Sequence, residues 1–207
     1  FINKLFLFHD VSKKITIKKN IMNFHILNHH LSGEHSDENI FITVKISELL
    51  GLNRSKILNA VESFKGLEHR QELVLSNNRI TIINDSKATN FESLITALKN
   101  YKNIYLICGG LAKDDNIKVL NKYINQLVMV FVIGLNENPF FNYFNERTKT
   151  YYVKNLSNAV RMALLSVKDS KSKSTILFSP GAASFDQFKN FEIRGLYFNK
   201  IIKKYIH

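Results

Sequence analysis

Several features that mark particular protein classes are scarce or missing in this sequence. It contains one cysteine, two prolines and no tryptophan in 207 residues. The single cysteine, Cys108, cannot form an internal disulfide, so a disulfide-framed secreted domain is excluded and a reducing, cytoplasmic setting is expected. No apolar run approaches the roughly 20 residues that a membrane-spanning helix needs. Residues 1–8 are apolar but too short for a signal peptide, and they lack a small-residue cleavage site.

Acidic residues are also few relative to basic ones. The chain has 29 Lys and Arg against 17 Asp and Glu, which gives a formal net charge of +12. Such a balance attracts polyanions, among them nucleic acids, nucleotides and phosphorylated metabolites. Only six of the basic residues are arginines, and the lysines are scattered along the chain, with clusters at 13–19, 168–173 and 200–204. A dedicated nucleic-acid face is therefore not favoured, although a basic nucleotide- or nucleic-acid-binding module stays an alternative.

The pattern of apolar residues from about residue 72 to the end of the chain predicts an α/β fold. Apolar residues make up 45% of the sequence, enough for a packed core. Two short runs, Glu72–Leu75 and Arg79–Ile83, are expected to form a hairpin. Further strands are expected at 104–108, 128–133, 150–153 and 175–178, and helices at 91–98, 117–126, 139–144, 156–165 and from 191. This alternation predicts a Rossmann-like, mostly parallel sheet with helices on both faces.

The first third of the chain has a different organisation. Two helices are expected there, one capped by Ser36 or Asp37 and ended by Gly51, and one over about 55–64. The stretch Gly66–Glu72 looks like a domain boundary. Short strand candidates lie at 15–17 and 22–27. Histidines between residues 25 and 30 are not joined by cysteines or carboxylates, so no metal site is predicted.

A polar heptad, Asn84–Asn90, is the most informative segment. It lies between a predicted strand and a predicted helix, at the strand's carboxyl end, where α/β folds bind ligands. It offers a carboxylate, an ammonium, two hydroxyls and the free N–H groups of a helix start. Asp85, Ser86 and Thr89 could simply cap the helix. A cap does not need Lys87, which the helix dipole disfavours, so we interpret the heptad as an anion site.

Two other polar turns follow predicted strands. They are Gly109–Asp115, which contains Lys113, and Ser179–Ser184. Because the carboxyl ends of parallel strands share one edge of a sheet, the three turns are predicted to converge. Adjacent glycines at the start of the first turn permit close backbone approach. Three polar turns with two lysines between them favour an anionic ligand over simple packing.

These segments resemble the carboxyl-terminal half of the Mur ligases. The resemblance rests on His69-Arg70, the heptad, Gly109-Gly110 with Lys113, and the run Ser179–Gly195, and it extends over residues 33–207. It is strongest to the members that add D-glutamate to UDP-N-acetylmuramoyl-L-alanine in peptidoglycan synthesis. The resemblance implies that residues 1–66 are the end of a central ATP-binding domain. It implies that residues 67–207 are a complete carboxyl-terminal domain.

The resemblance also implies a reaction and a set of roles. ATP with Mg²⁺ phosphorylates the substrate carboxylate, and the amine of D-glutamate attacks the resulting acyl phosphate. The implied roles are catalysis for Lys87 and Arg70, D-glutamate binding for Thr89, Lys113, Ser184 and the backbone of Phe191, and nucleotide contacts for Asn39, Arg70 and Asp85. In the segment that would lie near the adenine, Ser36 replaces the family's first asparagine, which leaves Asn39 as the candidate.

The sequence has no G-x-x-x-x-G-K-[ST] loop to hold ATP phosphates. That loop, a carbamylated lysine and the main magnesium ligands are expected upstream, because the chain does not begin with Met and looks like the carboxyl-terminal portion of a longer protein. The isolated chain is predicted to be inactive and monomeric. The enzymatic alternative is another ligase of the same group, which adds a different amino acid or extends folate with glutamate.

Overall fold

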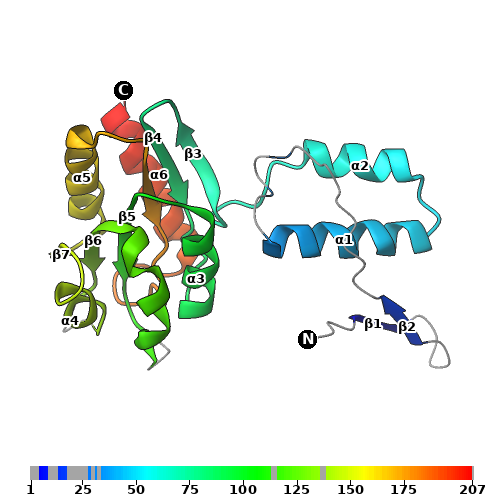
Figure 1. The fold of residues 1–207 in the computed structure, drawn as a ribbon, viewed down its shortest axis with the longest axis horizontal. Coiled ribbons are helices and arrows are strands. Elements are labelled where there is room, and N and C mark those ends of the chain that lie inside the picture. Colours follow the sequence, from blue (N-terminus) through cyan, green and yellow to red (C-terminus); the bar gives the residue numbers. More distant parts are fainter. Residues whose placement is uncertain are drawn as a thin grey trace. The chain divides into compact units, whose positions relative to one another are not determined.

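The computed structural model of the chain describes residues 5–8, 14–17, 28, 31, 34–112, 116–135 and 139–206. The chain divides into two compact units, Phe1–Lys65 and Gly66–His207 (Figure 1). Within the described residues, no helix combines the length and apolarity needed to cross a membrane. The strand expected at 22–27 and the turn residue Lys113 lie outside the described residues.

The described residues of the first unit form two short strands and two helices. Strands β1 (Leu5–Phe8) and β2 (Lys14–Ile17) pair antiparallel. Helices α1 (Glu34–Leu49) and α2 (Arg54–Ser63) share a small apolar core formed by Ile40, Val44, Ile57 and Val61. Because α1 begins at Glu34, Ser36 and Asp37 lie inside the helix, and the prediction that one of them caps it is wrong.

A six-stranded sheet forms the centre of the second unit, with strand order β3-β4-β8-β5-β6-β7. Its strands are β3 (Glu72–Ser76), β4 (Ile80–Asn84), β5 (Ile104–Gly109), β6 (Leu127–Ile133), β7 (Thr150–Lys154) and β8 (Ser174–Phe178). Only β3 runs antiparallel to its neighbour, as the predicted hairpin requires, and the other pairings are parallel. The predicted mostly parallel α/β fold is confirmed.

Helices cover both faces of this sheet (Figure 1). The elements are α3 (Phe91–Asn100), η1 (Ile117–Gln126), α4 (Pro139–Asn145), α5 (Leu156–Ser166), η2 (Val167–Asp169) and α6 (Phe191–Ile206). Successive strand residues alternate between the two cores. Leu106 packs with α3, η1 and α4, whereas Ile107 packs with α5 and α6. This alternation follows from the two-residue period of a strand.

The helix predicted at 117–126 is present, and the structure shows how it is wound. The segment 117–126 is a 3₁₀ helix, not an α-helix. Its apolar residues Ile117, Leu120 and Tyr123 recur every three residues, and all three face the core. A period of three matches the three residues per turn of a 3₁₀ helix, so this winding aligns them on one side.

Candidate functional site

The predicted convergence of polar turns is confirmed for the parts that the structure describes. Strands β4, β8 and β5 are adjacent and parallel, so the turns after them leave the same edge of the sheet. Backbone hydrogen bonds join these turns directly. The Asp85 N–H donates to the Phe178 carbonyl (2.7 Å), the Gly181 N–H to the Ala88 carbonyl (2.9 Å) and the Gly109 N–H to the Pro180 carbonyl (2.9 Å).

Glycine is required where two of the turns meet. Leu111 and Ala183 exchange backbone hydrogen bonds of 3.0 and 2.9 Å. Gly110 lies beside this pair with a φ of +125°, and a Cβ there would lie 2.5 Å from the Ala183 carbonyl oxygen. Neither the backbone angle nor the space suits another residue. The Gly-Gly pair therefore serves close packing of one turn against another.

The buried side chain of Arg194 connects these turns to α6. It is 1% exposed, and its guanidinium donates to the Ser86 hydroxyl (3.1 Å), the Ser86 carbonyl (2.8 Å) and the Ala182 carbonyl (3.1 Å). Burial lowers the pKa of Arg194 to about 10, against the opposing effect of the charges of Asp186 and Asp85. Arg194 therefore stays charged at neutral pH and fixes the heptad against the turn after β8.

Sequence reasoning did not identify this role of Arg194. A signal for it existed, because Arg194 precedes Phe198 by four residues and Ile201 by seven, which places it on the buried stripe of α6. An arginine on an apolar stripe must find acceptors inside the protein, and here these are the carbonyls and the hydroxyl of the two turns.

Asn84 and His69 form a second buried connection to α6. The Asn84 side-chain amide donates to Asn199 Oδ1 (2.9 Å) and to the Gly195 carbonyl (3.1 Å), and its oxygen accepts from the Ser86 N–H (3.1 Å). The His69 ring packs on Gly195, where a Cβ would lie 2.4 Å from His69 Nδ1. Asn84 and Gly195, both inside the quoted motifs, thus hold the heptad and α6 together.

Asp85 is buried, with 4% of its surface exposed. One carboxylate oxygen accepts from the Gln71 N–H (3.1 Å) and the other from the Ser179 hydroxyl (2.8 Å). Burial raises the pKa of Asp85 from 3.8 to about 7, although these two hydrogen bonds and the charges of Arg70 and Arg194 favour the ionised form. Part of its accepting capacity is thus already used within the protein.

The side chain of Lys87, in the turn after β4, reaches the first residue of α6. Its ammonium is 3.8 Å from the centroid of the Phe191 ring, and its side chain is exposed. The Ser86 hydroxyl donates to the Phe191 carbonyl (2.8 Å), which ties the heptad to the first residue of the helix. The side chain of Asn190 accepts from the Ile193 N–H (2.8 Å). A cation therefore lies beside a helix N-terminus, an arrangement that attracts carboxylates and phosphates.

The other predicted residues are placed as follows. Thr89 is half-buried in the heptad, two residues from Lys87, and Ser184 is buried in the turn that the heptad contacts. Arg70 is exposed and close enough to Asp85 to affect its charge. Asn39 is exposed on α1, in the other unit. The described residues contain no group of three or more His, Cys, Asp or Glu that could hold a metal ion.

A mostly parallel six-stranded sheet with helices on both faces defines the fold class, and solved structures share this fold. UDP-N-acetylmuramate-alanine ligase from Thermotoga maritima has a TM-score of 0.56 and 16% identity, over 84% of this chain and 39% of that chain. Folylpolyglutamate synthase from Mycobacterium tuberculosis, complexed with ADP and AMPPCP, has a TM-score of 0.60 and 16% identity, over 83% of this chain and 41% of that chain. The fold is thus the one shared by Mur ligases and folylpolyglutamate synthases.

Sequence relatives narrow this class. Three of them are curated proteins named UDP-N-acetylmuramoylalanine–D-glutamate ligase. The protein from Wolbachia sp. subsp. Brugia malayi is 38% identical over 86% of this chain and 37% of its own length. The protein from Rickettsia prowazekii is 36% identical over 86% of this chain and 40% of its own length, and the protein from Buchnera aphidicola subsp. Schizaphis graminum is 36% identical over 97% of this chain and 43% of its own length. The chain belongs to the Mur ligase family, and it spans about two fifths of the length of these relatives. No protein-family model matches it.

Proposed function

We propose that the chain is the carboxyl-terminal part of an ATP-dependent ligase that adds D-glutamate to UDP-N-acetylmuramoyl-L-alanine in peptidoglycan precursor synthesis. The names of its relatives support this substrate pair. The remaining machinery would lie in the part of those relatives that the chain does not span. In this proposal, residues 1–66 end a central ATP-binding domain and residues 67–207 form the domain that receives the amino acid.

The observation that carries the proposal is the position of Lys87. Its ammonium lies against the ring of the first residue of α6. The next residue, Ala88, accepts a backbone hydrogen bond from Gly181 in the turn that contains Ser184. D-Glutamate brings two carboxylates, and a lysine beside a helix N-terminus with hydroxyls nearby offers donors for such groups. Thr89, Ser184 and the Phe191 backbone would bind the amino acid from this side, together with Lys113.

Bound ATP would supply the phosphoryl group that activates the substrate carboxylate. Lys87 and Arg70 are exposed cations on the same edge, so they can offset the negative charge of the activated acid as the amine attacks. No side chain of this chain needs to act as a covalent nucleophile. The protein's contribution is to position the groups and stabilise charge.

The residues proposed to contact the nucleotide differ in how accessible they are to it. Arg70 is exposed and carries no competing ion pair among the described residues. Asp85 is buried and already accepts from Gln71 and Ser179, so any ribose hydroxyl would use the remaining lone pairs of its carboxylate. We therefore propose Arg70 as an open nucleotide contact and Asp85 mainly as its support. Asn39, which is exposed on α1 in the other unit, is proposed as a nucleotide contact by itself. The main ligands of Mg²⁺ are proposed to lie outside this chain.

The test is a chimera in which this chain replaces the matching segment of the Wolbachia ligase. We expect the chimera to release phosphate when ATP, UDP-N-acetylmuramoyl-L-alanine and D-glutamate are all present. Replacing D-glutamate by L-alanine, meso-diaminopimelate or L-glutamate should abolish turnover. A preference for one of these amino acids, or glutamate addition to folate, would overturn the substrate assignment.

The isolated chain provides the second arm of this test. We expect it to show no turnover under the same conditions, because it has no phosphate-binding loop of the G-x-x-x-x-G-K-[ST] type. Robust phosphate release by the isolated chain would show that ATP is held by residues to which the proposal gives no such role.

A further inference from the structure

The amino edge of the sheet, opposite the candidate site, gathers basic side chains from separate segments. Arg79 precedes β4, Lys102 precedes β5, and Lys171 and Lys173 precede β8. Lys168 lies just after α5, in η2. All five side chains are exposed. We call these five residues the basic edge. The sequence shows three of them as one lysine cluster, 168–173, but it does not show that Arg79 and Lys102 lie beside this cluster.

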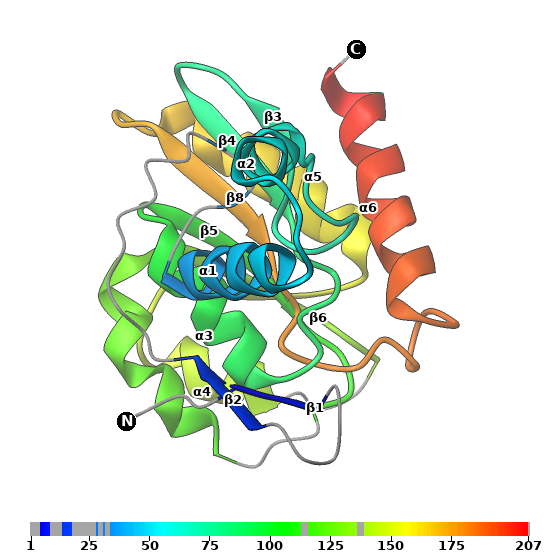
Figure 2. The same ribbon diagram turned by 90° about the vertical axis from the view of Figure 1, so that its right-hand side faces the viewer.

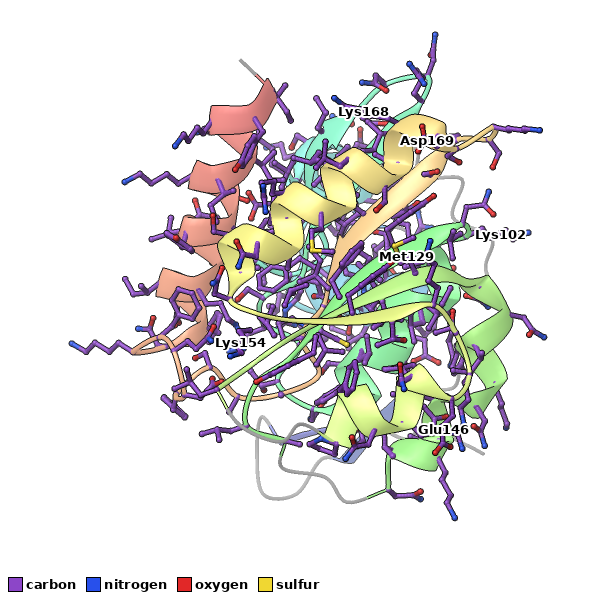
Figure 3. All side chains as sticks on the ribbon, turned by 90° about the vertical axis from the view of Figure 1, so that its left-hand side faces the viewer. Lys102, Met129, Glu146, Lys154, Lys168 and Asp169 are labelled. Atoms are coloured by element: carbon purple, nitrogen blue, oxygen red, sulfur yellow. The ribbon has the colours of Figure 1, made fainter. Side chains whose placement is uncertain are left out.

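Hydrogen bonds show that these segments adjoin. The Arg79 guanidinium donates to the Lys168 carbonyl (3.2 Å), and the Ser174 N–H donates to the Arg79 carbonyl (3.0 Å). The Lys173 ammonium donates to the Ser76 hydroxyl (3.3 Å). Lys102 is joined through its neighbour Asn103, whose side chain donates to the Lys173 carbonyl (3.3 Å). Figure 3 labels Lys102 and Lys168 toward the same end of the unit.

The positive charge of the basic edge is not neutralised within the described part of the chain. The segments 77–79, 102–103 and 167–173 contain one acidic residue, Asp169, and none of the ion pairs in the described residues includes any of the five. A helix dipole accounts for Lys168 at the end of α5, but Arg79, Lys102, Lys171 and Lys173 precede strands. Like charges repel, so their clustering does not serve the stability of the fold.

Exposed apolar side chains end the two helices on this side. Leu165 near the end of α5 is 52% exposed, and Tyr205 and Ile206 at the end of α6 are 45% and 41% exposed. Tyr205 and Ile206 follow Lys203 and Lys204, the basic residues in the last turn of α6. Figures 1 and 2 show the end of α6 and the β3–β4 turn at the same end of this unit. Basic residues with a few exposed apolar neighbours are the composition that binds membrane surfaces.

We propose that the basic edge docks this chain on a membrane surface that contains acidic phospholipids. Four of its five members are lysines, which act as point charges toward a diffuse negative surface. Nucleic-acid recognition relies on arginine forks at base edges and on stacking by aromatic side chains, and the basic edge with its exposed neighbours offers one arginine and one ring, Tyr205. Docking here leaves the carboxyl edge, with its candidate site, open to solvent. The inference does not depend on the proposed function.

The experiment is co-sedimentation of the 207-residue chain with vesicles. We expect binding to vesicles of phosphatidylcholine with about one third phosphatidylglycerol, and none to phosphatidylcholine alone. Raising NaCl from about 50 to 300 mM should release the chain, because salt screens charge at this range. The variant Lys168→Gln/Lys171→Gln/Lys173→Gln should weaken binding by at least about tenfold.

A matched control separates location from net charge. The variant Lys118→Gln/Lys154→Gln/Lys189→Gln removes the same charge from the opposite edge of the sheet. Lys118 follows β5, Lys154 is the last residue of β7, and Lys189 follows β8. It should bind acidic vesicles within about twofold of the unmodified chain. Equal losses in both variants would overturn the proposal, since net charge alone would then explain binding. Circular dichroism of both variants verifies that they remain folded.

Two other outcomes also overturn the proposal. One is the absence of binding to acidic vesicles at low salt. The other is binding of random-sequence DNA that is tighter than vesicle binding and is lost in the basic-edge variant, which would assign this surface to nucleic acid.

Discussion

The two edges of the central sheet use polar residues in opposite ways. On the carboxyl edge, Asn84, Asp85 and Arg194 are buried, and each is hydrogen-bonded to a different turn or helix. On the amino edge, lysines are exposed and form no ion pairs within the described residues. Buried polar groups specify one geometry, whereas exposed charges leave geometry free and act on partners. The carboxyl edge therefore has the rigidity that positioning a substrate requires.

The largest effect is expected from Arg194→Ala. This change leaves the Ser86 and Ala182 carbonyls buried without their donor. Each unsatisfied group costs about 1–3 kcal/mol, so we expect a loss of about 3–5 kcal/mol in the free energy of unfolding. Urea denaturation followed by circular dichroism measures it. Lys203→Ala, exposed on the same helix, is the control and should change stability by less than about 0.5 kcal/mol. A small loss for Arg194→Ala would show that the turns hold without it.

Gly110→Ala should have the next largest effect. A Cβ at Gly110 would lie 2.5 Å from a backbone oxygen at a φ of +125°, so both clash and strain arise. We expect a loss of about 2–3 kcal/mol. Gly51→Ala is the matched control, because Gly51 has a φ of +79° but nothing within 4 Å of the added Cβ. It should cost about 1 kcal/mol from strain alone. Equal losses of stability for Gly110→Ala and Gly51→Ala would show that the two turns can move apart at little cost in free energy.

Asp85 makes the carboxyl edge sensitive to pH. Its pKa is raised to about 7 in the folded protein, above its ordinary value, so the folded state holds the proton more tightly. Its contribution is favourable at low pH and is lost as pH rises from about 4 to 7. Between pH 5 and 7.5 the unmodified chain should lose about 2 kcal/mol more stability than Asp85→Asn. Parallel stability curves for the two proteins would show that Asp85 ionises normally.

The smallest effect is expected on the amino edge. Lys171→Gln and Lys173→Gln should change the free energy of unfolding by less than about 0.5 kcal/mol, because both side chains are exposed and make no ion pair in the described residues. Thermal unfolding of each single variant measures this. A loss comparable to that of Gly110→Ala would remove the distinction between the two edges.

Much of the fold was predictable from the sequence because its signals are local. The strand 104–108 is a continuous apolar run, and every residue of β5 is buried. The hairpin of β3 and β4 follows from its polar turn. The position of the heptad after β4 also followed from local pattern, and with it the convergence of turns on one edge.

The connections within the site were not predictable in the same way. Arg194, Asn84 and His69 are polar residues that a pattern assigns to the surface, yet each is buried by partners 15 to 115 positions away. Likewise, strand order brings Arg79 and Lys102 to the lysine cluster at 168–173, from which they are distant in sequence. Pairings of this kind depend on tertiary geometry, which hydrophobic periodicity does not encode.

The central claim is that the carboxyl edge holds D-glutamate, and Ser184 tests it most directly. In the chimera with the Wolbachia ligase, Ser184→Ala should raise the KM for D-glutamate at least about tenfold, because on this proposal the Ser184 hydroxyl would bond a charged carboxylate of D-glutamate. The KM for ATP should stay within about twofold, since the nucleotide contacts are left intact. Equal increases in both KM values, or an unchanged KM for D-glutamate, would contradict the account.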